Sequence, residues 1–556
     1  MSEWLQHQTS ACSVLLAATE KVKVNKGRTM RFLGKIYKVI FSRAFITAML
    51  IILQVIWFLL IYSYFFVGYE YVRTAVSALA LLYTIYIINS PRTKREYQTE
   101  WIIVILLFPF FGVPFYMICG DQRQGRKYAK RVEDAKIKYS SFHNQDMNLM
   151  DEIYKLDSRI HSTCTYMMKS MGYPVYKNTK VTYLSSGEEQ YEGLIEAMKN
   201  AKHYIFMEYF MIERTGVWNS MLEVIKQKAE EGVEVRILYD DLGCISWLPK
   251  RYDKFLNKLH KNIHCKKFNR VKPLFTMLTN NRDHRKMSII DGYIAFTGGI
   301  NLADRYINVN SPFGKWKDAG LKIEGEAVQN FTLMYLEMWE SMKIGRSSRK
   351  IETPEEMKKI NSYLPHFFHE TDFTNDGYVQ PFGDEPFDNV PLSENAYLEL
   401  INQAEKYLYV FTPYLIPSQS MTDAMCLAAQ RGVDVRIVTP HIPDKRIVFR
   451  ITRSNYKKFM DHGVKIYEYT PGFIHSKCML CDNDKAIVGT VNLDYRSLFL
   501  HFEDAVLLYK CEAVNELRKD MIRTFKESRL QTEEDTKRNI FGRLLDATLV
   551  FFEPIV

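Results

Sequence analysis

A long internal duplication constrains this chain more than any other feature. The segments AKHYIFMEYFMI (201–212) and EEGVEVRILYDD (230–241) are followed by AEKYLYVFTPYLIP (404–417) and QRGVDVRIVTP (430–440) in the same order. The closest match sets GVEVRIL against GVDVRIV. A duplication of this length indicates two domains of one fold, and short buried strands alternating with helices indicate α/β layers. The sequence therefore predicts two α/β domains related by a pseudo-twofold axis.

Each half carries the same short motif, H-x-K-x-x-x-x-D followed by a Gly-rich turn and then Asn. It occurs in NRDHRKMSIIDGYIAFTGGIN (281–301) and in PGFIHSKCMLCDNDKAIVGTVNLDYRS (471–497). A single copy would be weak evidence, because short patterns arise by chance. Two copies at matching places in a duplicated chain favour a functional site over satisfied core histidines. We expect the catalytic residues to be His284, Lys286 and Asp291 with His475, Lys477 and Asp482, supported by Asn301 and Asn492.

The spacing of the motif has a chemical meaning. Residues two apart on a strand point to the same face, so each histidine should lie beside its lysine. An imidazole acts as nucleophile, base or acid near neutral pH, and an ammonium group neutralises phosphoryl oxygens. Two such pairs about a pseudo-twofold axis predict a pocket for phosphodiester exchange. No cluster of carboxylates or histidines in the sequence indicates a metal site, and we expect no cofactor.

Each catalytic imidazole needs a partner that fixes its tautomer. The strand predicted after each motif offers a carboxylate, Asp318 in WKDAG and Glu503 in HFEDA. Asp504 is an alternative, since it aligns with Asp318 if no gap is allowed. These acids could also simply lie at strand edges in water.

The nine cysteines are scattered, and only Cys478 and Cys481 form a close pair. A C-x-x-C pair can be half of a zinc site or a redox centre. Because no second pair lies nearby and the run is strand-like, we expect buried, reduced cysteines instead.

Three apolar runs follow a basic amino-terminal segment, at about 45–67, 74–89 and 101–119. Three such runs in succession predict a membrane anchor, because a bilayer core needs about 20 apolar residues per crossing. Basic residues flank the runs at 1–44, at 91–96 and after 120. The positive-inside rule places all three regions in the cytoplasm. We therefore expect the third run, which contains Pro109, Gly112 and Pro114, to dip into the membrane and return, with the catalytic domains on the cytoplasmic side.

The remaining boundaries follow from composition, and the last segment is expected either to pack on the body or to lie in the membrane interface. The predicted divisions are a basic segment (1–44), a membrane anchor (45–120), a linker helix (121–165), a first domain (166–348), a linker (349–385), a second domain (386–530) and a carboxy-terminal helix (531–556).

The doubled motif resembles the phospholipase D superfamily, and its surroundings are similar to bacterial cardiolipin synthases over about residues 70–530. The segments that carry the resemblance are NRDHRKMSIIDGYIAFTGGINLADRY, WKDAGLKIEGEAVQ, FTPYLIPSQSMTDAMCLAAQRGVDVRIVTP, VKIYEYTPGFIHSKCMLCD and the third apolar run. One departure lies in VNLDYRSLFLHFE (491–503), where many relatives have Asn at the place of His501; Glu503 stays in register.

The resemblance implies two phospholipase D-like domains and a phosphatidyltransferase. Such an enzyme joins two phosphatidylglycerols into cardiolipin and glycerol through a phosphatidyl-histidine. It also implies that His284 is the nucleophile and His475 the acid and later the base. Lys286 and Lys477 would bind phosphoryl oxygens, and Asn301 and Asn492 would add hydrogen bonds.

Other functions stay open at this point. The net charge of +10 attracts either nucleic acid or anionic lipid, so a nuclease of the same superfamily is one alternative. A membrane phospholipase D, or a transferase to another alcohol, would use the same chemistry. A non-catalytic scaffold is disfavoured, because both motifs are intact. The membrane runs favour phosphatidylglycerol, cardiolipin and an anionic membrane as partners, with no nucleic acid; the oligomeric state is open.

Overall fold

A computed structural model of the 556-residue chain describes residues 70–90, 95–117, 126–271, 280–343, 349–367, 375–388 and 390–551, with a few single positions between 49 and 63. The predicted basic segment 1–44 lies outside the described residues, as does nearly all of the first apolar run, 45–67. One compact unit takes in 71–271 and 276–556.

The second and third apolar runs form helices. The second run falls in α3 (Glu70–Asn89), and the third is divided between α4 (Arg95–Leu107) and α5 (Pro109–Phe115). A Cβ atom on Gly112 would lie 2.5 Å from the Cα of Ile105, so the chain bends back sharply at Phe108, next to Pro109. Among the described helices, none has both the length and the apolar character that a membrane crossing needs.

The predicted linker helix 121–165 is a set of three helices that belong to the body. They are α6 (Arg126–Tyr139), α7 (Met147–Leu156) and α8 (Ser158–Met171). Asp146 and Asp157 begin the last two, since each side chain accepts a backbone N–H in the first turn. Ile153 and Ile160 are fully buried in the main hydrophobic core. The segment therefore packs as part of the fold and does not act as a spacer.

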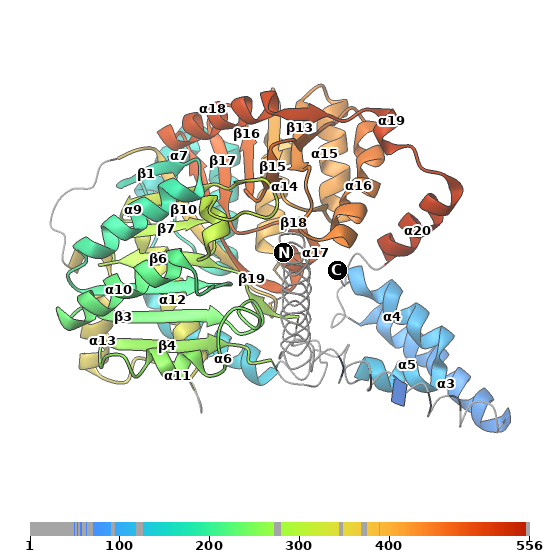
Figure 1. Cartoon of the computed structure of the whole chain (residues 1–556), viewed down its shortest axis with the longest axis horizontal. Coiled ribbons are helices and arrows are strands. Elements are labelled where there is room, and N and C mark those ends of the chain that lie inside the picture. The colour runs from blue at the N-terminus through green and yellow to red at the C-terminus, as the bar shows by residue number, and fades with distance from the viewer. Residues whose placement is uncertain are drawn as a thin grey trace, which may run out of the picture. The chain divides into compact units, whose positions relative to one another are not determined.

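The first half is a seven-stranded sheet in the order β1-β9-β7-β6-β2-β3-β4 (Figure 1, green). β2, β3 and β4 run parallel, and the other pairs are antiparallel. The strands are β1 (Thr179–Leu184), β2 (Tyr204–Tyr209), β3 (Glu234–Asp240), β4 (Ile263–Phe268), β6 (Lys286–Ile290), β7 (Ile294–Gly298) and β9 (Gly320–Gly325). The accompanying helices are α9 (Gly187–Asn200), α10 (Gly216–Glu230), α11 (Tyr252–Leu256) and α12 (Val328–Ser341).

The second half repeats this order as β10-β19-β17-β16-β11-β13-β14, with β20 added at one edge (Figure 1, orange and red). The prediction of a duplicated α/β fold is thus confirmed. The strands are β10 (Tyr378–Asp384), β11 (Tyr407–Phe411), β13 (Asp434–Pro440), β14 (Lys465–Tyr469), β16 (Cys478–Cys481), β17 (Lys485–Gly489), β19 (His501–Tyr509) and β20 (Ser528–Leu530). The helices are α14 (Leu392–Gln403), α15 (Gln419–Gln430), α16 (Arg446–Met460), α17 (Tyr495–Phe499) and α18 (Glu512–Lys526).

The predicted linker 349–385 needs correction. It contains a helix, α13 (Pro354–Asn361), and all of β10, which pairs with β19 along its whole length. The sequence YVQPFGD looks like a loop because it includes Pro381 and Gly383. Proline is tolerated there because β10 is an edge strand.

Short strands also join the two halves. β5 (Arg282–Asp283) leaves the first half to pair with β19, and β15 (Gly472–Ile474) leaves the second half to pair with β8 (Lys315–Lys317). A further short pair, β12 (Leu415–Ile416) with β18 (Leu493–Asp494), lies within the second half. β5 and β15 each end immediately before a motif histidine.

The carboxy-terminal segment contains α19 (Glu533–Thr536) and α20 (Ile540–Phe551). One side of α20 packs on the body: Arg450 of α16 donates to Asp546 over 2.6 Å, and Leu549 packs against Val448. The other side exposes large apolar residues, among them Phe541 at 81% and Leu544 at 68%. The helix therefore packs on the body and still presents an apolar surface.

Candidate active site

Strand pairing between the halves places both motif histidines. β5 runs parallel to β19, with Asp283 opposite Phe502. The next residue, His284, donates its backbone N–H to the carbonyl of Phe502 over 2.9 Å, which brings it to the level of Glu503.

An equivalent strand pairing positions the second histidine. Ile474 of β15 lies opposite Lys317 of β8, and His475 donates its backbone N–H to the carbonyl of Lys317 over 2.7 Å. His475 therefore lies level with Asp318. The two pairings are equivalent by the pseudo-twofold relation, and each joins a histidine of one half to a strand of the other.

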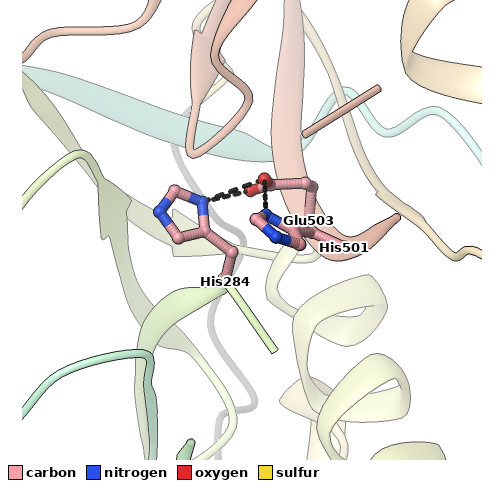
Figure 2. A group of neighbouring side chains, drawn as sticks. All are labelled: His284, His501 and Glu503. Carbon is pink, nitrogen blue, oxygen red and sulfur yellow. Dashed lines mark hydrogen bonds and ion pairs between the residues drawn. The ribbon is translucent and has the colours of Figure 1, made fainter. Parts of the chain in front are cut away.

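The side chains follow the strands. His284 Nδ1 lies 2.9 Å from both carboxylate oxygens of Glu503 (Figure 2), and His475 Nδ1 lies 2.8 Å from Asp318 Oδ2. A carboxylate only accepts, so Nδ1 carries the proton in each ring and Nε2 is the basic nitrogen. In the sequence, one carboxylate follows each motif. In the structure, each of these carboxylates contacts the histidine of the opposite half.

Asp504, the alternative partner, has another position. Its carboxylate accepts from the hydroxyl of Thr297 and from the backbone N–H of Lys286, the latter over 3.2 Å. The strand pairing sets Asp318 equivalent to Glu503 and not to Asp504. The alignment without a gap is therefore off by one residue.

Asp291 and Asp482 were grouped with the catalytic residues, and the structure corrects this. Asp291 accepts backbone N–H groups of Lys202, His203 and Tyr204 over 2.7–2.8 Å at the start of β2. Asp482 does the same for the residues that lead into β11. Each aspartate lies seven positions after its histidine, roughly 20 Å along a strand. Both hold adjacent strand ends together.

Lys286 and Lys477 are buried behind the histidines. Lys286 Nζ donates to the carbonyl of His284 over 2.5 Å, and Lys477 Nζ donates to the carbonyl of His475. Each ammonium keeps two further N–H groups for other acceptors. Burial lowers the pKa of Lys286 to about 8 and that of Lys477 to about 7, although nearby carboxylates oppose the change.

Burial also controls the protonation of the histidine pairs. It lowers the pKa of His284 well below its usual value and that of His475 to about 4, with the neighbouring lysine acting in the same direction and the paired carboxylate against it. Burial tends to raise the carboxylate pKa values, but the histidine and lysine partners outweigh it and lower those of Asp318 and Glu503. Neutral imidazoles paired with ionised carboxylates result.

Both histidines open into one cavity of about 950 Å³. The two motif asparagines, Asn301 and Asn492, also line it; Asn301 donates to Tyr306 over 2.9 Å, and the buried side-chain oxygen of Asn492 has no hydrogen-bond partner among the described residues. Much of the remaining wall is aromatic or aliphatic, with a few cationic side chains. These residues include Phe210, Tyr306, Phe313, Trp316, Ile447 and Val448, with Arg305, Lys445 and Arg446.

Sequence reasoning missed several supporting groups. The Thr490 hydroxyl donates to Glu503 over 2.5 Å, and the Trp316 indole donates to Asp318 over 3.3 Å. His501, noted only as a departure, lies beside Glu503 and lines the cavity. Thr490 is part of the predicted Gly-rich turn, but only the pairing of the strands shows which carboxylate it reaches.

Cys478 and Cys481 are free and buried in β16. Residues three apart on a strand face opposite sides of the sheet, so they cannot bind one ion together. Within the described ranges, one group of three potential metal ligands was found, His284, His501 and Glu503. This group could not be predicted from the sequence, because His501 is distant from His284 along the chain.

Comparison with known proteins places this geometry in a family. The family profile described as "cardiolipin synthase, PLD-like domain" matches residues 194–330 and 397–525, one match in each half. An uncharacterised protein of Streptococcus mutans is 38% identical over 85% of this chain and 99% of its own length. A cardiolipin synthase of Halalkalibacterium halodurans is 30% identical over 88% of this chain and 94% of its own length.

The fold has counterparts among solved structures. Phosphatidylserine synthase of Haemophilus influenzae Rd KW20 superimposes with a TM-score of 0.52 at 14% identity, over 68% of this chain and 95% of that one. At that identity the likeness concerns the fold alone. The full-length similarity to cardiolipin synthases, together with one matched domain in each half, shows that this chain belongs to the cardiolipin synthase family of the phospholipase D superfamily.

Proposed function

We propose that this enzyme transfers a phosphatidyl group from one phosphatidylglycerol to another, giving cardiolipin and glycerol. The observation that carries the proposal is the pair of histidine–carboxylate couples that open into one cavity. Two imidazoles with equivalent surroundings suit a reaction in which one phosphodiester replaces another, since each step needs a nucleophile and a proton donor or acceptor. The reaction is nearly balanced in bond energy, so it requires no nucleotide.

In the first step, Nε2 of His284 attacks the phosphorus of phosphatidylglycerol. A P–N bond forms, the P–O bond to the terminal glycerol breaks, and protonated His475 gives its Nε2 proton to the departing oxygen. Although burial lowers the pKa of His475 to about 4, an anionic phosphodiester beside the ring favours the protonated form. Glu503 stabilises the positive charge that develops on His284.

In the second step, neutral His475 removes the proton from a glycerol hydroxyl of another phosphatidylglycerol. The resulting oxygen attacks phosphorus, the P–N bond breaks, and His284 returns to its neutral state. We assign the binding of the charged phosphoryl oxygens to the remaining N–H groups of Lys286 and Lys477. Each ammonium is held beside its histidine by a hydrogen bond to that residue's carbonyl. The assignment of His284 as nucleophile follows the pattern of the superfamily.

The direct test is to incubate the purified enzyme with phosphatidylglycerol alone. We expect one glycerol for each cardiolipin and almost no phosphatidic acid. Phosphatidic acid and glycerol in equal amounts would instead identify a hydrolase. A product formed only after another alcohol is added would identify a different transferase.

The apolar helices lead us to propose membrane attachment, with the catalytic body on the cytoplasmic side. The support is that α3 exposes a row of large apolar side chains, as does the outer face of α20, and such exposed patches mark membrane or protein contacts. The residues are Leu79, Leu81, Leu82, Ile85 and Ile88 on α3, and Ile540, Phe541, Leu544 and Leu545 on α20. A tethered site avoids extracting acyl chains into water, at about 0.8 kcal/mol per CH₂.

Sidedness can be tested with proteases. Added to sealed cells they should leave residues 121–556 intact, and added to inverted vesicles they should cut them. Cutting from outside would place the active site on the other face and would also contradict a re-entrant third apolar run.

A further inference from the structure

His501 is a buried histidine whose ring contacts Glu503 without a hydrogen bond. It is 9% exposed, and neither nitrogen has a hydrogen-bond partner among the described residues. Its Nδ1 lies 3.6 Å from Glu503 Oε1, and its ring centre lies 5.4 Å from that of His284 (Figure 2). Buried polar groups normally have a hydrogen-bond partner, so a buried imidazole that contacts a carboxylate without a hydrogen bond points to a ligand.

The surrounding atoms have the arrangement of a metal site. One ligand atom from each of His284, His501 and Glu503 lies within 4.8 Å of the others. Two histidines and one carboxylate form a donor set that Zn²⁺ takes with a fourth position open. Ligand atoms around tetrahedral zinc are about 3.4 Å apart. The separations of 2.9 Å from His284 to Glu503 and 3.6 Å from His501 to Glu503 lie on either side of that value.

The opposite half of the site provides an internal comparison. Trp316 and His501 occupy equivalent positions, each two residues before the carboxylate that holds a histidine. The indole of Trp316 donates to Asp318 and cannot bind a cation through its nitrogen. Among the residues that the structure describes, three such ligands therefore meet only beside His284.

We propose that His284, His501 and Glu503 form a binding site for a zinc-class divalent ion, and that the bound ion stops His284 from acting as a nucleophile. The second part rests on the proposed function. An ion on Nδ1 displaces the proton that His284 shares with Glu503. The neutral ring then carries its single proton on Nε2, so the lone pair that would attack phosphorus is lost.

Charged groups also surround the site. A metal needs neutral imidazoles and an ionised carboxylate, and Glu503 contacts the rings of both His284 and His501. The positive charges of Lys286 and Arg285 oppose the ion. Each of these cations also contacts a carbonyl of the site, Lys286 that of His284 and Arg285 that of Glu503.

The first test measures binding without lipid. Full-length protein in detergent is titrated with Zn²⁺ by calorimetry and with Co²⁺ by absorption, as wild type, His501→Asn and His441→Asn. His441 is the matched control, because it is an exposed histidine 2.9 Å from Glu468. We expect one strong site and tetrahedral cobalt bands in wild type and His441→Asn. Removing a metal-site group costs about 10–100-fold in affinity, so His501→Asn should lose at least tenfold.

The second test measures cardiolipin formation with increasing Zn²⁺, each variant relative to its own metal-free rate. We expect wild type and His441→Asn to be inhibited and then restored by EDTA, and His501→Asn to resist. Equal zinc affinity in wild type and His501→Asn would overturn the site, and equal inhibition would overturn its effect on His284. If His501→Asn melts at a lower temperature than the wild type, both tests are repeated with His501→Gln. Binding is read without lipid, so its outcome is independent of whether phosphatidylglycerol is the substrate.

Discussion

Glu503 is the residue on which several supporting contacts converge. It holds His284 through both oxygens, accepts from Thr490, and comes from the opposite half of the chain. Asp318 holds His475 through one oxygen and accepts from Trp316. The two couples are equivalent in position and different in detail, which gives the site two distinguishable histidines.

Replacing Glu503 by Gln should lower kcat by about 10²–10⁴-fold. The amide cannot stabilise the positive charge on His284 and leaves the tautomer unfixed. Asp504→Asn is the matched comparison, because Asp504 is a buried neighbour that contacts Thr297 and not the imidazole. Full turnover in Glu503→Gln together with none in Asp504→Asn would show that the register is wrong. Both rates should be read beside melting temperatures.

The two buried motif lysines predict an upper pH limit for activity. Burial lowers the pKa of Lys477 to about 7 and of Lys286 to about 8, so each loses its charge well below the usual lysine range as pH rises. Because kcat/KM reports the free enzyme, it should fall above about pH 7–8 as affinity for the anionic phosphate is lost. Lys477→Arg keeps its charge and should move the limit upward, whatever its absolute rate. An unchanged limit in both Lys477→Arg and Lys286→Arg would mean that the lysines do not cause it.

The motif histidines, lysines and asparagines could be predicted because they repeat along the chain. The crossed pairing of His284 with Glu503 could not, since it depends on a two-residue strand, β5, that joins the other half's sheet. The role of Asp291 was misjudged for a related reason. The spacing of the H-x-K-x-x-x-x-D motif does not show that its aspartate lies at the far end of a strand from its histidine.

At the level of elements, the turn after β7 must leave room for Asp318. A Cβ atom on Gly299 would lie 2.0 Å from Asp318 Oδ1 and 2.9 Å from the carbonyl oxygen of His475. The equivalent residue in the other half is Thr490, whose side chain instead contacts the longer Glu503. Glycine with aspartate and threonine with glutamate are thus two ways of filling the same space.

Gly299→Ala should displace Asp318 from His475, lowering kcat at least tenfold and stability by about 1–3 kcal/mol. The matched variant is Gly193→Ala in α9, where the new Cβ would lie at an ordinary 3.4 Å from Phe296. This variant should keep its activity, and its free energy of unfolding should rise by about 0.5–1 kcal/mol, as expected for Gly to Ala in a helix interior. Steady-state kinetics and thermal unfolding of both variants check this. Wild-type activity in Gly299→Ala would mean that the turn can relax.

The exposed face of α20 predicts membrane contact. Phe541→Glu and Leu544→Glu should each weaken binding to phosphatidylglycerol vesicles by tenfold or more, because burial of such a side chain is worth about 1.5–3 kcal/mol. Leu427→Glu on α15, also at an exposed apolar position, is the control and should bind normally. Vesicle flotation of protein lacking residues 1–120 removes the contribution of the preceding helices. Unchanged flotation of both α20 variants would exclude this contact.

Short buried strands that repeat in both halves could be predicted from sequence, as β2, β3, β11 and β13 show. β10 could not, because Pro381 and Gly383 are typical of a loop and only pairing with β19 makes the segment a strand. The segment 121–165 was predicted to be a linker helix, although the buried faces of its helices complete the core. Both misjudgements concern segments whose structure is decided by tertiary contacts.

At the scale of the whole molecule, neither half is complete alone. Each supplies one histidine and the carboxylate that holds the other half's histidine, so the duplication is maintained by chemistry as well as by packing. One cavity then serves two successive reactions on one phosphorus. The first leaves the phosphatidyl group on the enzyme, and the second passes it to another lipid.

Trapping that intermediate is the most direct test of the covalent mechanism. Enzyme mixed with phosphatidylglycerol labelled at phosphorus is denatured at alkaline pH, where phosphoramidates survive, and its peptides are mapped. We expect up to one label per chain, on His284. Fresh phosphatidylglycerol added before denaturation should release this label as labelled cardiolipin. Label on His475 would reverse the roles of the two histidines, and steady turnover with no labelled histidine would contradict the covalent mechanism.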